Sequence, residues 1–244
     1  MRSDKVGLGL CIAVVAAAVA FALFSDSPYY VQVTVWMFTN ALLASSLRFV
    51  MLIGELNIAT AAFFGLGAYA VGVASSLWGW SFVPALLLAP VIAAATSAVF
   101  GWITLRARGP YFLLISFAFT EVVRLMYSKS ASVGGNSGMV GIFPPRALDD
   151  LFPALAICVM AACLFALYAV ERSDIGRIFK AIAVNENIPR SVGLNVTALK
   201  VLCVVFASAV AGLGGGLHAF SNSVITPGDF TFFVAVLALA YVKL

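Results

Sequence analysis

The sequence has little charge for its length. Asp, Glu, Lys and Arg make up 10% of its 244 residues, whereas 63% of the residues are hydrophobic. Soluble domains carry about 25% charged residues, so this composition excludes a water-soluble fold. We interpret the formal net charge of +4 as a sign of basic loops beside a membrane rather than of a nucleic-acid site.

Groups that carry chemistry are also scarce. The four cysteines lie in apolar runs without a Cys-x-x-Cys pair, which disfavours a disulfide or a metal site. The single histidine, His218, stands at the end of a predicted helix, where an interfacial position is the common one. The glycine-rich loop 133–141 lacks the Gly-Lys-Ser/Thr ending of a nucleotide-binding loop. We expect no cofactor and no catalytic residue, and therefore not an enzyme.

Long apolar runs are what the sequence has in abundance. Val6–Phe24 contains no charged residue over 19 positions, and about 20 such residues cross the ~30 Å hydrocarbon core of a bilayer. Turn-forming residues separate several segments of this kind. The sequence predicts an all-α, polytopic transmembrane helix bundle in a single domain, 1–244, with about eight spans at 6–24, 30–53, 58–77, 82–104, 111–127, 152–170, 200–218 and 231–244.

The distribution of Lys and Arg predicts how this bundle is oriented. With the N-terminus in the cytoplasm, eleven of the 14 basic residues fall on the inner side. Only Lys129 and Arg146 then fall on the outer side, and Arg124 lies within a span. Basic residues concentrate in cytoplasmic loops, so we expect a cytoplasmic N-terminus.

Polar residues interrupt the chain before the third predicted span. Glu55, Asn57 and Thr60 directly precede the apolar run 61–69. One interpretation is a short turn that Asn57 or Thr60 caps. The other is a broken helix at membrane depth, with Asn57 and Thr60 lining a substrate pathway, because interrupted hydrophobic segments often mark transport sites.

The fifth predicted span contains two charged residues, Glu121 and Arg124. Their i,i+3 spacing puts them on one helix face, where they can pair. Ionisable residues in a span usually face the bundle interior or a wet pathway, so both are candidates for the substrate pathway. The alternative is an interfacial pair near the outer helix end, retained for assembly.

Small residues indicate where helices pack closely. Gly65 and Gly67 lie in the third predicted span, and Gly212, Gly215 and Gly216 lie in the seventh. Membrane helix interfaces are rich in small residues, because these let two backbones approach. We expect these five glycines to make helix–helix contacts.

Residues 171–199 form the only sizeable polar stretch on the predicted cytoplasmic side. Apolar residues from Ile175 to Ile182 recur at i, i+3, i+4 and i+7, which predicts a short amphipathic helix, followed by a turn and a second short element ending at Gly193. One interpretation is a helix on the membrane surface. The other is a surface that docks into a cytoplasmic partner, which the mixed charges favour over adhesion to anionic lipid. The candidate contact residues are Arg177, Ile178, Ile182, Glu186, Ile188, Arg190 and Gly193.

Four motifs, in this order, resemble one family. Residues 61–69 are similar to the stretch HAAFFGIGAY of LivM-type permeases of branched-chain amino acid ABC importers. Residues 106–125 resemble LRLRGPYFAIVTLAFGEIVRL in the same family, and residues 134–142 and 176–195 resemble GGSNGLSGI and GRALRAIRENEIAARALGIN. Thr60 stands where the family often has His. The chain ends at Leu244, where family sequences continue, so we expect the domain to be short at its C-terminus.

The resemblance implies a multi-pass permease in a bacterial-type cytoplasmic (inner) membrane, working by ATPase-driven alternating access. Its implied partners are a second permease subunit in a heterodimer, two cytoplasmic ATPase subunits that press on residues 174–195, and an extracytoplasmic substrate-binding protein. Branched-chain or related amino acids are the expected cargo, with urea or short amides as an alternative. An autonomous channel or secondary transporter is the alternative from another class.

Overall fold

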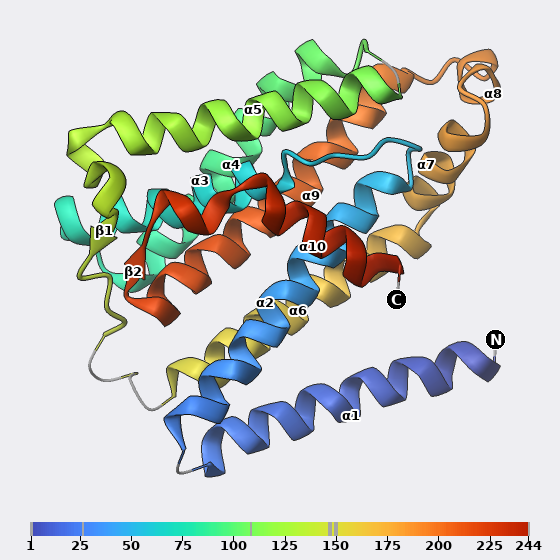
Figure 1. The fold of residues 1–244 in the computed structure, drawn as a ribbon. Coiled ribbons are helices and arrows are strands. Elements are labelled where there is room, and N and C mark those ends of the chain that lie inside the picture. Colours follow the sequence, from blue (N-terminus) through green and yellow to red (C-terminus); the bar gives the residue numbers. More distant parts are fainter. Residues whose placement is uncertain (1, 26, 108, 146–147, 149–150, 244) are drawn as a thin grey trace.

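The computed structural model describes residues 2–25, 27–107, 109–145, 148 and 151–243, and helices make up most of it (Figure 1). A π-helical stretch, Val73–Leu77, extends α3, and two short strands pair near one end of the bundle. The helices are α1 (Arg2–Phe24), α2 (Pro28–Met51), α3 (Thr60–Gly72), α4 (Phe82–Thr104), α5 (Pro110–Lys129), α6 (Phe152–Arg172), α7 (Asp174–Val184), α8 (Asn187–Ser191), α9 (Val196–Asn222) and α10 (Phe232–Lys243).

The prediction of an all-α membrane bundle is confirmed. Among the described residues, six helices are long and apolar enough to cross a membrane: α2, α3 with its π-helical extension, α4, α5, α6 and α9. Two shorter apolar helices, Cys11–Phe24 and Phe232–Val242, fall at the first and last predicted spans. The number of eight spans therefore stays a prediction, as does the cytoplasmic N-terminus.

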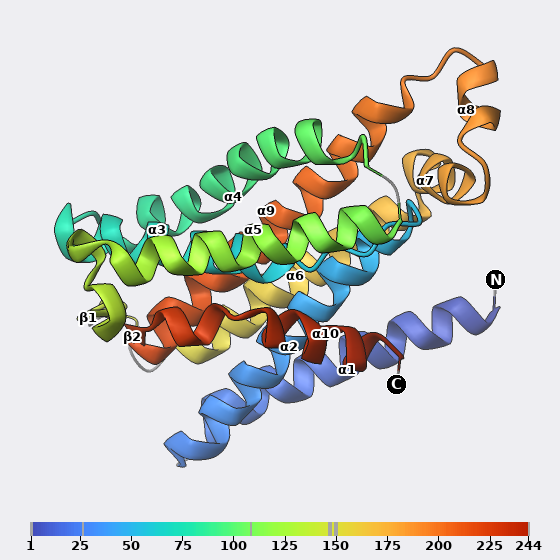
Figure 2. The same cartoon turned by 45° about the horizontal axis from the view of Figure 1, so that its top comes forward.

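The bundle has two distinct ends. At one end, β1 (Met139–Val140) pairs antiparallel with β2 (Val224–Ile225), which joins the loop after α5 to the end of α9. At the other end lie α7, α8 and the N-terminus, as Figures 1 and 2 show. The polar stretch predicted between 171 and 199 thus forms two short helices at a single end of the molecule.

Helix α9 lies at the centre of the bundle and packs against α2, α3 and α4. Glycines make these contacts close. A Cβ atom on Gly67 would lie 2.0 Å from the carbonyl oxygen of Gly212, and one on Gly215 would lie 1.9 Å from that of Phe64. Real side chains do not tolerate such distances, so α3 and α9 approach backbone to backbone, as the small residues predicted.

The connection between α2 and α3 is not helical. Residues 52–59 lead from the end of α2 into the bundle, and α3 begins beside the middle of α5. There the amide of Ile58 donates to the Ser116 hydroxyl at 3.2 Å, and the carbonyl of Ile58 accepts from the Thr120 hydroxyl at 3.4 Å. Hydroxyl groups of α5 therefore bond the backbone of Ile58, where the helical pattern is interrupted.

We predict that Gly215→Ala disrupts the α3–α9 contact, because its methyl group would overlap the Phe64 carbonyl. Overpacking of this kind costs about 1–3 kcal/mol and should lower the thermal midpoint of the purified chain in detergent by several degrees. Gly101→Ala in α4 is the matched control, since its Cβ would meet only ordinary contacts at 3.4 Å or more. Equal midpoints for the two variants would contradict the close approach.

Candidate functional site: a coupling segment, a buried ion triad and a pocket

The coupling segment, residues 171–199, presents apolar side chains to solvent. Ser173 caps α7 by accepting a hydrogen bond from the amide of Gly176, and Gly193 takes a positive φ of +82° at the turn after α8. Val184, Ile188 and Val192 are 83%, 55% and 75% exposed. These three apolar side chains are exposed in or next to α7 and α8.

The predicted contact residues of this segment divide into two groups. Ile182 is only 2% exposed and packs into the core of this chain, as does Phe179, and Ile178 packs against that core. These residues therefore hold α7 against the bundle. Four of the others, Arg177, Glu186, Ile188 and Arg190, lie on the side of the segment that faces away from the core or at its edge.

Ion pairs join the coupling segment to the membrane helices at two points. Glu171 at the end of α6 accepts from Arg48 of α2 at 2.9 Å and from Lys180 of α7 at 3.2 Å. Lys200, in the first turns of α9, lies 2.7 Å from Glu186 and 3.1 Å from Glu55. The segment is therefore held by charge as well as by packing.

The second of these networks, the triad Glu55–Lys200–Glu186, is the more deeply buried. The side chains of Lys200 and Glu55 are 5% and 6% exposed, and Glu186 also bonds Arg190 at 2.9 Å. Lys200 thus connects the residue before α8 to the non-helical segment 52–59. The local sequence pattern did not predict this contact, because Glu55 and Lys200 are 145 positions apart. Their only signal was a carboxylate and an ammonium in otherwise apolar surroundings.

The predicted pathway residues Asn57 and Thr60 lie in the helix break. Both are buried, at 0% and 2% exposure. Asn57 accepts from the amide of Ala59, and Thr60 donates to the carbonyl of Asn57, so the two make the local turn that starts α3. The Nδ2 atom of Asn57 has no hydrogen-bond partner among the described residues. Their role in a substrate pathway stays a prediction.

The other predicted pathway residues, Glu121 and Arg124, pair as their spacing indicates. Their side chains meet at 2.8 Å on α5 and are 25% and 30% exposed. The pair is therefore half-buried. On α5, Glu121 directly follows Thr120, whose hydroxyl bonds Ile58 in the helix break. Its part in transport likewise stays a prediction.

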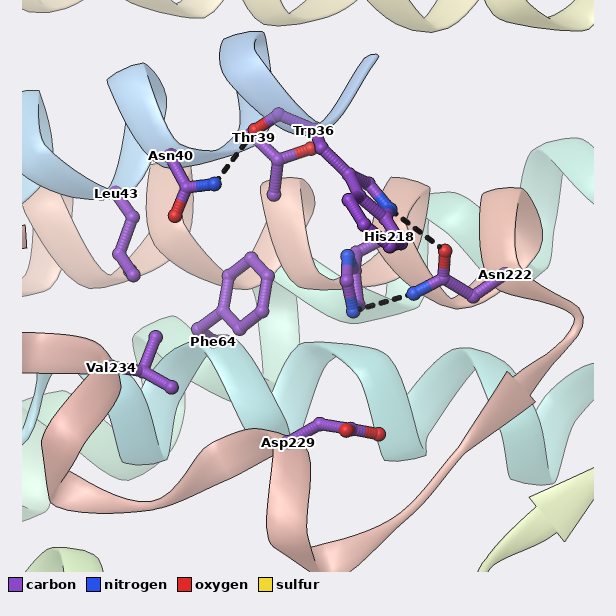
Figure 3. Close-up of a pocket in the computed structure, with 9 residues that line it drawn as sticks. All are labelled: Trp36, Thr39, Asn40, Leu43, Phe64, His218, Asn222, Asp229 and Val234. Carbon is purple, nitrogen blue, oxygen red and sulfur yellow. Dashed lines mark hydrogen bonds between the residues drawn. The ribbon is translucent and has the colours of Figure 1, made fainter. Parts of the chain in front are cut away.

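A pocket of about 330 Å³ opens between α2, α3, α9 and α10 (Figure 3). It is lined by apolar and polar side chains together: Trp36, Thr39, Asn40, Leu43, Phe64, His218, Asn222, Asp229 and Val234. A cleft of about 660 Å³ shares Trp36 and Asn40 with this pocket and continues along α2 to Arg48. Apolar pockets with a few convergent polar groups are the usual sites for small ligands.

Sequence reasoning missed this pocket. Its polar residues are spread over α2, α9 and the turn before α10, so no single stretch of sequence revealed it. The available signal was the spacing of polar residues inside spans: Trp36 and Asn40 are four positions apart, as are His218 and Asn222. Such residues lie on one helix face, and intramembrane polar groups are a reason to expect function.

The buried triad gives a test of how the coupling segment is held. Lys200→Met leaves Glu55 buried without a counter-ion, which should destabilise the protein by about 3–5 kcal/mol. The double variant Glu55→Gln/Lys200→Met removes the charge as well and should recover much of that loss in thermal unfolding of the purified chain. Arg177→Met is the control, because its pair with Asp174 is 77% and 90% exposed and should matter little. Equal losses in the single and double variants would contradict a coupled buried pair.

Comparison with known proteins covers most of the chain. The family described as branched-chain amino acid transport system / permease component matches residues 29–244. Similar relatives are the high-affinity branched-chain amino acid transport system permease proteins LivM of Salmonella typhimurium and Escherichia coli K12, each 26% identical over 221 residues, which cover 78% of this chain and 52% of the relative. The chain thus spans about half the length of the curated relatives that it matches. No solved structure matches it.

These matches confirm the resemblance that the four sequence motifs predicted. They extend over the helix break, the pocket and the coupling segment, all of which lie between residues 29 and 244. The chain belongs to the family of permease components of branched-chain amino acid transport systems.

Proposed function

We propose that the chain is a membrane-spanning permease subunit of an ABC importer for branched-chain or related amino acids. The observation that carries this proposal is the coupling segment, whose exposed apolar residues sit on two short helices that ion pairs join to the membrane helices. A cytoplasmic ATPase that binds Val184, Ile188 and Val192 would bury a small apolar surface ringed by charge, which is the usual make-up of a protein interface.

The proposed mechanism is alternating access driven from this segment. Two ATPase subunits hydrolyse ATP, and their movement displaces α7 and α8. Because Lys200 bonds both Glu186 and Glu55, a displacement of α8 acts directly on the segment 52–59 and so on the start of α3. This chain contributes the moving helices, and its partners contribute the ATP hydrolysis.

The remaining partners are a second permease subunit and an extracytoplasmic substrate-binding protein, in a bacterial-type inner membrane. The exposed polar side of α2 is the observation that supports a second permease subunit as a partner. Trp36 and Asn40 are exposed along a cleft that continues to Arg48, and polar residues in a span are normally covered by protein or water. A second permease on this side would close the cleft. The substrate follows the printed names of the relatives, which concern branched-chain amino acids.

We predict that Ile188→Asp weakens binding of the ATPase at least tenfold, because it places a charge in the centre of the exposed apolar surface. The measurement is pull-down of the co-expressed ATPase, together with ATP-driven uptake of leucine in proteoliposomes. Val140→Asp is the matched control, since Val140 is 66% exposed on β1 at the opposite end. If Ile188→Asp binds the ATPase as the unmodified chain does, the segment is a membrane-surface helix and not a docking site.

The turn at Gly193 allows a second test. Its φ of +82° is strained for a β-branched residue and tolerated by asparagine. Gly193→Val should therefore lower the ratio of leucine imported to ATP hydrolysed several-fold, whereas Gly193→Asn should keep most of it. Open space surrounds the Cβ position, so a clash cannot account for the difference. The same ratio in both variants would argue against a role for this turn in coupling.

A further inference from the structure

A chain of hydrogen bonds in the pocket fixes the orientation of Asn222. The indole nitrogen of Trp36 can only donate, and it lies 3.0 Å from Oδ1 of Asn222. Gln32 donates to the same oxygen at 2.9 Å. The amide oxygen of Asn222 therefore faces Trp36 and Gln32, and its NH₂ group must face the other way.

That orientation in turn fixes the proton on His218. The NH₂ group of Asn222 lies 2.9 Å from Nε2 of His218, so it donates and Nε2 accepts. An imidazole whose Nε2 accepts carries its proton on Nδ1. The ring of His218 consequently offers an Nδ1–H donor.

This donor lacks an acceptor. Nδ1 of His218 is buried and has no hydrogen-bond partner among the described residues, although the ring lines the pocket. Buried donors in folded proteins are nearly always paired, and exceptions call for an explanation. A ligand with a negatively charged or carbonyl oxygen, bound in the pocket, would supply the missing acceptor.

Asp229 brings the opposite charge to the same pocket. Its Oδ2 accepts from the amide and the hydroxyl of Thr226, at 2.8 and 3.0 Å, which holds the side chain in place. A carboxylate accepts about four hydrogen bonds, so capacity remains for a cationic group. Figure 3 shows His218 and Asp229 on facing sides of the pocket, with the apolar side chains of Leu43, Phe64 and Val234 to one side of both.

We infer that this pocket binds a free, zwitterionic amino acid with an aliphatic side chain. Its carboxylate accepts from Nδ1–H of His218, its ammonium group pairs with Asp229, and its side chain packs against Leu43, Phe64 and Val234. The inference specifies a substrate site of the proposed importer and rests on that proposed function. A volume of about 330 Å³ lies within the range of small-ligand pockets.

The test measures binding of radiolabelled L-leucine to the purified full chain in nanodiscs, with two analogues as competitors. 3-Methylbutylamine lacks the carboxylate and any other acceptor oxygen, and 4-methylpentanoate lacks the ammonium group. We expect both analogues to bind at least tenfold more weakly than leucine. Competition by either analogue at the strength of leucine overturns the inference, as does the absence of leucine binding at millimolar concentration.

Variants assign each half of the ligand to its residue. His218→Phe should weaken leucine at least tenfold and leave 3-methylbutylamine within about twofold, because 3-methylbutylamine has no oxygen that could accept from Nδ1–H. Asp229→Asn keeps an acceptor for Thr226 and should weaken leucine at least tenfold but leave 4-methylpentanoate unchanged. His218→Gln, which restores an N–H donor, should recover part of the loss. Trp102→Phe, at an exposed position on α4 outside the pocket, is the control and should bind leucine normally.

Folding and function are separated by two further measurements. Thermal unfolding of each variant shows whether a loss of binding reflects misfolding. If His218→Phe is misfolded, the leucine affinity of His218→Gln tests the N–H donor instead. ATP-driven leucine uptake by the reconstituted complex distinguishes the site from the function. Equal leucine binding by His218→Phe and the unmodified chain, with uptake intact, overturns the site and leaves the importer standing. Leucine binding without uptake of any amino acid supports the site and contradicts the importer.

Discussion

The structure depends on how it satisfies backbone that is not helical but is buried inside the bundle. Each unpaired backbone group in hydrocarbon costs several kcal/mol, so the segment 52–59 can exist only where other elements supply its hydrogen bonds. Ser116 and Thr120 of α5 bond Ile58, and Lys200 of α9 pairs with Glu55. The positions of α5 and α9 beside this segment follow from that requirement.

The buried charges beside this segment need an explanation of their own. Desolvating an ion pair is costly, and a buried pair alone is weak evidence for stability. Lys200, however, bonds two carboxylates that belong to different elements, one before α3 and one before α8. A hydrophobic side chain could fill its space, but it could not tie these two elements together. The triad therefore makes sense as a connection rather than as a source of stability.

Sequence reasoning predicted what depends on local pattern and missed what depends on distant contacts. Apolar run length predicted the helices, and i,i+3 spacing predicted the Glu121–Arg124 pair. Small residues predicted close helix packing, which the structure has between Gly67 and Gly212. The triad and the pocket escaped because each combines residues from three or more elements. Ile182 shows a subtler limit: helical periodicity identified its apolar face, but could not tell whether that face packs inward or awaits a partner.

Helix α9 links the buried triad to the pocket. Lys200 lies near its start and His218 near its end, 18 residues and about 27 Å apart along one continuous helix. Between them, Gly212, Gly215 and Gly216 bring α9 into close contact with α3 and α4. An α-helix is stiff along its axis, because every turn is hydrogen-bonded to the next. A displacement of Lys200 along the helix axis would therefore be carried along α9 towards the pocket at His218.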